Sequence, residues 1–149
     1  MFKRNCKLNS KKDTDNLAKI LAATAVKGAV FCLYGELGTG KTFFTQKFCN
    51  HLGIKEIVNS PSYMIMHEYK NSVPVFHLDL YRLKSEEEVL ELGLEEIFET
   101  GITLIEWPRL AEFIIPRHSI KIFFSLKNQQ RCAKLITPKS LDNLTGLGK

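Results

Sequence analysis

The hydrophobic positions of this chain switch between two spacings, every second residue and every third or fourth residue. Alternation is typical of half-buried strands, and the longer spacing is typical of helices with one apolar face. The strands that this pattern predicts are residues 2–8, 29–34, 63–69, 73–80, 102–105, 119–126 and 131–137. The helices that it predicts lie between Asp13 and Gly28, around Phe44 to Leu52, and in three short stretches that begin near Ser85, Leu94 and Trp107.

Turn and capping residues separate these segments. Lys70-Asn71-Ser72 and Asn128-Gln129-Gln130 each divide two strands and predict two hairpins. Asp13-Thr14-Asp15 offers capping residues for the first helix, and Ser85 with Glu88 forms a capping box for a later one. Strands that alternate with helices, together with two hairpins, predict an α/β fold with a mixed, partly parallel central sheet flanked by helices.

Length and composition fit one domain without membrane segments. The chain has 149 residues, of which 44% are hydrophobic and 25% charged, as in ordinary globular proteins. No apolar run approaches the roughly 18–20 residues of a membrane span, and the N-terminus lacks the apolar stretch of a secretory signal. Four scattered cysteines without a Cys-x-x-Cys pair argue against a zinc site and favour the reducing cytoplasm. We expect residues 1–137 to form the domain and 138–149 a flexible tail.

Charge is distributed unevenly along the sequence. Residues 85–112 contain nine Glu and one Arg, whereas residues 117–149 contain seven Lys or Arg and one Asp. Residues 1–12 add five more positive charges. Solvated faces that happen to segregate explain this pattern simply. The alternative is that the basic ends help to hold RNA or an acidic partner.

The stretch Gly35-Glu36-Leu37-Gly38-Thr39-Gly40-Lys41-Thr42 matches the P-loop pattern Gly-x-x-x-x-Gly-Lys-Ser/Thr. Its glycines permit a tight turn whose backbone N–H groups cradle phosphates, Lys41 reaches the β- and γ-phosphates, and Thr42 offers a hydroxyl to Mg²⁺. A predicted strand precedes the stretch and a predicted helix follows it, as the motif requires. The sequence therefore predicts a three-layer P-loop NTPase-like fold.

Two acids follow buried strand patterns and are candidates for the same site. A P-loop needs a carboxylate at the end of a neighbouring strand to hold Mg²⁺ directly or through water. Asp79 ends Val75-Phe76-His77-Leu78-Asp79, and Glu106 ends Ile102-Thr103-Leu104-Ile105-Glu106. Asp79 fits this role, and Glu106 could ligate the ion or orient an attacking water. The simpler alternatives are an Asp that caps a turn and a Glu that forms a salt bridge at a helix start.

Three further side chains have an ordinary structural explanation beside a functional one. Trp107, the only tryptophan, stacks on a planar group or simply packs. We expect His77, which shares a strand face with Asp79, to be a hydrogen-bonded structural residue rather than a base. Ser62 is by default a turn hydroxyl, although it could reach a γ-phosphate. The sequence contains no Asn-Lys-x-Asp and no paired-arginine lid, so neither guanine specificity nor transfer to a small acceptor is supported.

Five motifs in order resemble the TsaE (YjeE) family, bacterial ATPases of the machinery that makes threonylcarbamoyladenosine on tRNAs. The resemblance covers about residues 10–137. Besides the P-loop, the motifs are Ser60-Pro61-Ser62-Tyr63, His77-Leu78-Asp79-Leu80-Tyr81-Arg82, Glu91-Leu92-Gly93-Leu94-Glu95-Glu96 and Glu106-Trp107-Pro108. The family's loop usually contains Ser-Pro-Thr-Phe, and many members carry an acid after Trp-Pro where this chain has Arg109. We assign no role to that position.

The resemblance implies a set of site residues. It implies that Lys41 and the loop amides of residues 36–40 (Glu36, Leu37, Gly38, Thr39 and Gly40) bind the phosphates of ATP. It further implies that Thr42 and Glu106 hold Mg²⁺ and that Asp79 is the second acid of the site. Trp107 would matter for activity or nucleotide contact, and Thr14 resembles a position that contacts the nucleotide base.

The resemblance also implies partners. Family members join the TsaD–TsaB heterodimer, and their ATP binding or turnover resets that complex between rounds of tRNA modification, whereas the carbamoyl transfer belongs to TsaD. The expected activity is a slow, partner-stimulated, Mg²⁺-dependent ATPase that meets tRNA indirectly or through the complex. Two alternatives remain open: a nucleotide-dependent docking module in which hydrolysis is incidental, and a small-molecule or nucleoside kinase. In the docking alternative, the acidic stretch 85–99 would be the docking face.

Overall fold

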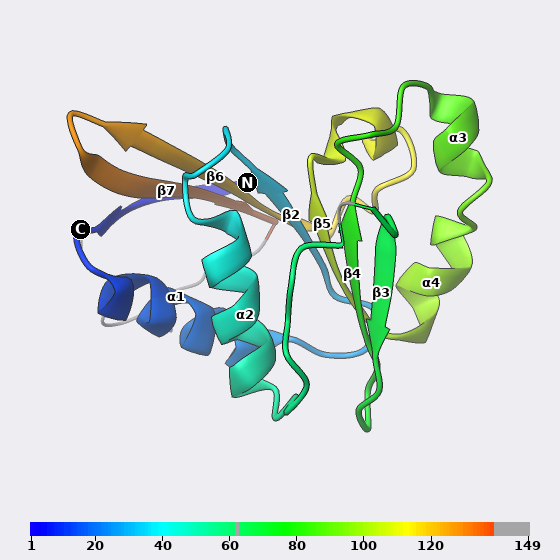
Figure 1. Ribbon diagram of the computed structural model, residues 1–149, viewed down its shortest axis with the longest axis horizontal. Helices are drawn as coiled ribbons and strands as arrows, with labels where there is room; N and C mark the ends of the chain where they lie inside the picture. The colour runs from blue at the N-terminus through cyan, green and yellow to red at the C-terminus, as the bar shows by residue number, and fades with distance from the viewer. Residues whose placement is uncertain (62, 139–149) are drawn as a thin grey trace.

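A seven-stranded sheet forms the centre of the described part of the chain, residues 1–61 and 63–138 of the computed structural model (Figure 1). Its strands are β1 (Phe2–Leu8), β2 (Val30–Tyr34), β3 (Met66–Tyr69), β4 (Val75–Asp79), β5 (Ile102–Glu106), β6 (Ile120–Lys127) and β7 (Gln130–Thr137). The helices in the same residues are α1 (Lys11–Thr24), α2 (Lys41–His51), α3 (Glu86–Leu90), α4 (Leu94–Thr100) and the short 3₁₀ helix η1 (Pro108–Ala111).

The sheet is mixed, as the sequence predicts. Its order is β1-β7-β6-β2-β5-β4-β3, and the central strands β6, β2, β5 and β4 are parallel to one another. The flanking pairs β3–β4, β6–β7 and β1–β7 are antiparallel. Because the carboxyl ends of parallel strands meet at one edge, the loops after β2, β4 and β5 gather there.

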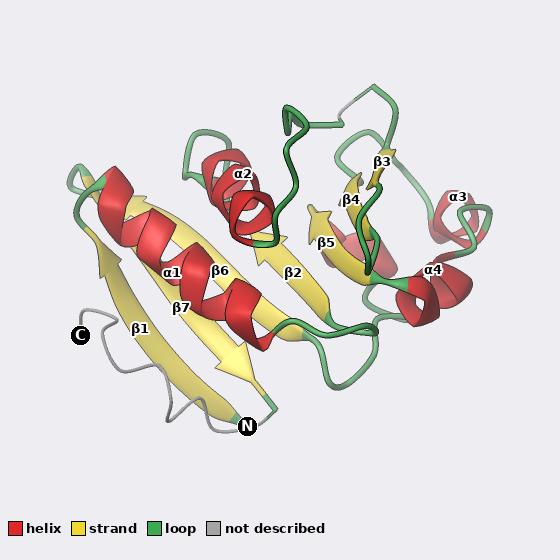
Figure 2. Ribbon diagram, turned by 90° about the horizontal axis from the view of Figure 1, so that it is seen from below, coloured by secondary structure: helices red, strands yellow, loops and turns green. Residues whose placement is uncertain are grey.

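Helices cover both faces of the central strands and complete three layers (Figure 2). Strand β2 is buried along its whole length and shows why both covers are needed. Phe31 and Leu33 pack with α1 and α2, whereas Val30, Cys32 and Tyr34 pack with α3, α4 and η1. The expected α/β fold with three layers is confirmed. No helix within the described ranges is long and apolar enough to cross a membrane.

The start of α1 differs from the prediction. The capping residue is Ser10, whose hydroxyl accepts a hydrogen bond from the Asp13 N–H, so the cap predicted at residues 13–15 is wrong. Asp13 in turn accepts from the Asn9 N–H at 2.9 Å, which makes a reciprocal cap one turn earlier. The reason is that Thr14 already belongs to the buried face of the helix. Strand β3 also begins later than predicted, because residues 63–65 form a turn in which Ile65 has φ 66°.

Candidate functional site

The loop between β2 and α2 turns sharply against the edge where the parallel strands end. Gly38 and Gly40 have φ of 79° and 107°, left-handed values that favour glycine, and α2 begins directly after Gly40. Gly35 is tightly enclosed, since a Cβ there would lie 2.7 Å from the carbonyl oxygen of Phe124 on β6. The strand, loop and helix that the P-loop motif requires are therefore present, and the amino end of α2 closes the loop.

Lys41 holds a buried ammonium group beside this loop. Its side chain is 5% exposed, and its Nζ donates a hydrogen bond to the Gly35 carbonyl and lies 3.6 Å from the centroid of the Trp107 ring. Burial lowers the pKa of the Lys41 ammonium, although the negative charges of Glu106, Asp79 and Glu36 oppose that shift. The direct contacts of this buried cation are a carbonyl oxygen and an aromatic ring, so it is a favourable place for an incoming anion.

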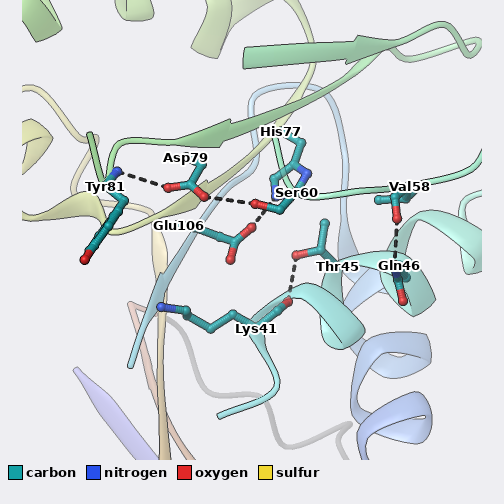
Figure 3. Close-up of polar contacts among 9 residues, drawn as sticks. All are labelled: Lys41, Thr45, Gln46, Val58, Ser60, His77, Asp79, Tyr81 and Glu106. Atoms are coloured by element: carbon teal, nitrogen blue, oxygen red, sulfur yellow. Dashed lines mark hydrogen bonds and ion pairs between the residues drawn. The ribbon is translucent and has the colours of Figure 1, made fainter. Parts of the chain in front are cut away.

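Asp79 and Glu106 stand side by side at the ends of β4 and β5. They are register partners in this parallel pair and are 4% and 3% exposed. Asp79 accepts hydrogen bonds from Ser60 Oγ and from the Tyr81 N–H, each at 3.0 Å. Asp79 therefore caps a turn, the simpler alternative, and also stands beside Glu106 above Lys41 (Figure 3).

His77 fixes the orientation of Glu106. Its ring is fully buried, and its Nε2 lies 2.7 Å from Glu106 Oε2, so the expected hydrogen bond is observed, whereas a structural role rather than that of a base stays a prediction. Nε2 donates to the carboxylate, whereas Nδ1 has no hydrogen-bond partner among the described residues. This contact engages only one oxygen of Glu106, so Oε1 stays available on the side of Lys41 (Figure 3).

The donor set fits a magnesium ion that shares its coordination with phosphates. Mg²⁺ prefers oxygen ligands and is commonly held by one or two carboxylates together with water and substrate phosphates. Asp79 and Glu106 supply two neighbouring carboxylates, and Thr42 places a half-buried hydroxyl residue at the second position of α2. Across residues 1–61 and 63–138 no group of three or more His, Cys, Asp or Glu forms a complete metal cage.

Thr14 lies at the other end of the loop, in a groove of about 550 Å³. This groove is lined by Gly40 of the loop, by Phe43 of α2 and by the hairpin residue Arg131 as well as by Thr14. Arg131 Nη2 also reaches the carbonyl oxygen of Gly38 at 3.5 Å. Sequence reasoning missed Phe43 and Arg131, because only the fold brings α1, α2 and the β6–β7 hairpin to one place. The composition of the basic C-terminal segment was the only signal that pointed toward Arg131.

Trp107 closes the opposite side of the site in an unusual backbone conformation. Its φ of 56° is left-handed, and its N–H donates to the Leu33 carbonyl at 3.3 Å. The indole lies 4.9 Å from the ring of Tyr81 and covers the Lys41 ammonium. Trp107 therefore packs against Tyr81 and Lys41, and the contact with Lys41 also places it beside the candidate site. Ser62, the remaining candidate, lies outside the described residues.

A family model and the curated relatives indicate one family. Residues 8–134 match the family model described as Threonylcarbamoyl adenosine biosynthesis protein TsaE. The tRNA threonylcarbamoyladenosine biosynthesis protein TsaE of Bacillus subtilis is 44% identical over 113 residues, 74% of this chain and 70% of that protein. The protein of the same name from Rickettsia bellii is 38% identical over 126 residues, 83% and 88% of the two chains. The crystal structure of Bacillus subtilis YdiB superposes with a TM-score of 0.77 at 31% identity and covers 93% of this chain and 87% of that one.

Proposed function

Because the chain belongs to the TsaE family of threonylcarbamoyladenosine biosynthesis proteins, we propose that it is a Mg²⁺-dependent ATPase that supports formation of this modified nucleoside on tRNA. The observation that carries the ATPase proposal is the placement of a buried Lys41 ammonium between the P-loop and the adjacent strand-end acids Asp79 and Glu106. A cation, a ring of backbone amides and two carboxylates are the parts that phosphoryl-transfer sites use.

Each residue has a separate task in this proposal. The loop amides, the amino end of α2 and Lys41 bind the triphosphate, and the groove that contains Thr14 receives the base. Thr42, Asp79 and Glu106 would hold Mg²⁺, which when bound neutralises phosphate charge. Glu106 keeps one oxygen engaged by His77 and presents the other toward the loop, where it would ligate the ion or, with Asp79 and Thr42 holding the ion, orient an attacking water.

The proposed partners are TsaD and TsaB type proteins, with tRNA reached through the complex. Apolar side chains that are exposed around the site support a protein contact there. Leu37, Tyr63, Met64 and Tyr81 are 74%, 85%, 68% and 58% exposed. Exposed apolar residues clustered beside a site indicate a surface that another protein covers. We infer that partner binding closes the site and stimulates a slow intrinsic ATPase.

A docking module with incidental hydrolysis is the second candidate, and the acidic helices favour it. The first turn of α3 carries three consecutive glutamates, and α4 carries two more in its first turn. Such a surface suits a basic partner. The two candidates differ in whether repeated cycles of tRNA modification need ATP turnover or only ATP binding.

The test compares site variants with charge-matched controls. Lys41→Ala and Asp79→Asn are expected to abolish ATP turnover, whereas Lys19→Ala and Asp15→Asn, both on α1, leave it intact. Turnover is measured in the pure protein and with TsaD–TsaB, and circular dichroism checks the fold. Unchanged turnover in both site variants would contradict the ATPase proposal. Multiple rounds of modification with a non-hydrolysable ATP analogue would favour the docking module instead.

A further inference from the structure

The two basic segments of the sequence meet on one side of the sheet. Strand β1 comes from the basic N-terminal segment, and β6 and β7 come from the basic segment after residue 117. In the fold, β7 pairs with β1 along seven residues and with β6 on its other side, so segments more than 100 residues apart become neighbours. No Asp or Glu occurs in any of these three strands.

Side-chain alternation sends the lysines to the face opposite α1. On the α1 side, Cys6, Leu8, Ala133 and Leu135 are buried in the core. The intervening positions form the other face, which we call the basic face. Its lysines are Lys3, Lys7, Lys121, Lys127 and Lys134.

Register places these lysines in neighbouring rows across the three strands. One row contains Lys3, Ile136 and Lys121, and the next contains Asn5, Lys134 and Phe123. Lys3, Lys7 and Lys134 are all exposed. These lysines therefore occupy adjoining positions on one face of the sheet rather than scattered sites.

No helix among the described residues covers this surface at β1 and β7. The core formed with α3, α4 and η1 includes residues of β2, β4 and β5, and from β6 only Phe123 joins it. Helix α1 lies across the other face of the same strands (Figure 2). Two acids border this face: Glu112 lines a groove with Lys121, and Glu36 lines one with Lys127. Glu112 Oε1 also accepts a hydrogen bond from the Tyr34 hydroxyl.

A solvated antiparallel face explains polar residues here but not their uniform sign. Lysine on the edge strand β1 also discourages pairing between molecules. Ordinary soluble surfaces intersperse both charges, however, and this chain places nine glutamates in residues 85–112 and none on the basic face. Because glutamates and lysines lie on different elements, the positive charge of the basic face indicates a binding role.

We propose that the basic face binds RNA through its phosphate backbone. A sheet face with spaced lysines suits phosphate contacts, which position a nucleic acid without reading its sequence. RNA is favoured over an acidic protein because phosphates repeat densely along its strands, and because the relatives are named for biosynthesis of a tRNA nucleoside. This proposal goes beyond ATP turnover: Lys3, Lys7 and Lys134 are not among the residues that line the grooves beside the P-loop, and binding needs no nucleotide.

The experiment uses two triple variants of the full chain with the same change in charge. Lys3→Gln, Lys7→Gln and Lys134→Gln together remove three lysines from the basic face. Lys12→Gln, Lys19→Gln and Lys55→Gln remove three exposed lysines from α1 and from the loop after α2. Fluorescence anisotropy with a labelled tRNA transcript gives the dissociation constant over a series of KCl concentrations. Nucleotide binding and circular dichroism confirm that both variants fold.

The basic-face variant is expected to bind about tenfold more weakly, with the slope of log affinity against log salt smaller by about 2–3. The control variant is expected to change affinity by less than about threefold. If the triple variant does not fold, Lys134→Gln alone must reduce the slope by about one. Equal losses in both triple variants, or no salt-dependent binding by the wild type, would overturn the proposal. So would competition by polyglutamate as effective as competition by unlabelled tRNA, because the face would then be a site for an acidic protein.

Discussion

Replacing His77 with leucine tests whether its ring stabilises the protein by donating a hydrogen bond to the buried carboxylate of Glu106. Both side chains are almost inaccessible, with exposures of 0% for His77 and 3% for Glu106, and they are joined at 2.7 Å. Leucine has a similar size, so little cavity is created, but it leaves a buried carboxylate without its donor. The perturbation therefore isolates one polar contact.

The expected loss of stability follows from these contacts. Removing one partner of a buried charged hydrogen bond costs about 3–4 kcal/mol. Leucine also removes the Nδ1 atom of His77, which has no hydrogen-bond partner among residues 1–61 and 63–138, and this removal returns about 1 kcal/mol. The net loss is about 2–3 kcal/mol, which lowers the melting temperature by about 4–12 °C in a domain of this size.

The assay is urea unfolding followed by circular dichroism, arranged as a double-mutant cycle. Glu106→Gln removes the buried charge, so His77→Leu should cost about 1–2 kcal/mol less in that background. His67→Leu is the matched control, because His67 faces His77 across the β3–β4 pair but its side chain is 38% exposed, and it should change stability by less than about 0.5 kcal/mol. If His77→Leu costs the same in the wild-type background as in the Glu106→Gln background, the stranded charge is not the cause and the reasoning is refuted.

Three further predictions concern the backbone and the buried cation. Because burial lowers the folded-state pKa of Lys41, its charged ammonium destabilises the folded protein at neutral pH, and this cost fades as the pH rises from the folded-state pKa toward the ordinary value. Lys41→Met should therefore be at least as stable as the wild type at pH 7 and should lose any advantage at high pH. Urea titrations at both pH values would measure this. Gly101→Ala should unfold the protein or destabilise it by more than about 3 kcal/mol, because the new Cβ would lie 2.2 Å from the carbonyl oxygen of Pro74. Gly53→Ala is the control: its Cβ would enter open space, and its φ of 86° should cost about 1 kcal/mol in the same assay. Trp107 is the only tryptophan and contacts Lys41, so its fluorescence should change when Mg²⁺-ATP is added to the wild type and not to Lys41→Met.

Local features of the sequence were enough to predict most elements and the kind of residue at the site. The P-loop is recognisable because its glycine, lysine and hydroxyl positions are contiguous, and the two acids are recognisable because each ends a buried apolar run. Both runs form fully buried strands that end at Asp79 and Glu106. Period and turn residues also predicted both hairpins, whose antiparallel pairing is observed.

Arrangements that depend on distant parts of the chain could not be predicted in this way. Hydrophobic period gives no strand order, so the register that aligns Asp79 with Glu106 and the approach of Arg131 to Gly38 appear only in the fold. The error at the start of α1 has a local cause, since Ser10 competes with Asp13 as a cap and burial of Thr14 decides between them. The tail predicted at residues 138–149 lies almost wholly outside the described residues and stays a prediction.

The contacts of Lys41 also determine which ligands can bind beside it. A ligand that binds this ammonium displaces two contacts. The hydrogen bond to Gly35 contributes about 1 kcal/mol, and the cation–π contact with the Trp107 ring contributes about 0.5–2 kcal/mol. A phosphate repays that cost, because hydrogen bonds between charged groups are about twice as strong as neutral ones, but an uncharged ligand does not. Trp107 is held in place by its left-handed backbone, which lies between Glu106 and Pro108 and donates to Leu33. We therefore expect the strained residue to keep the cation covered until an anion of sufficient charge competes for it.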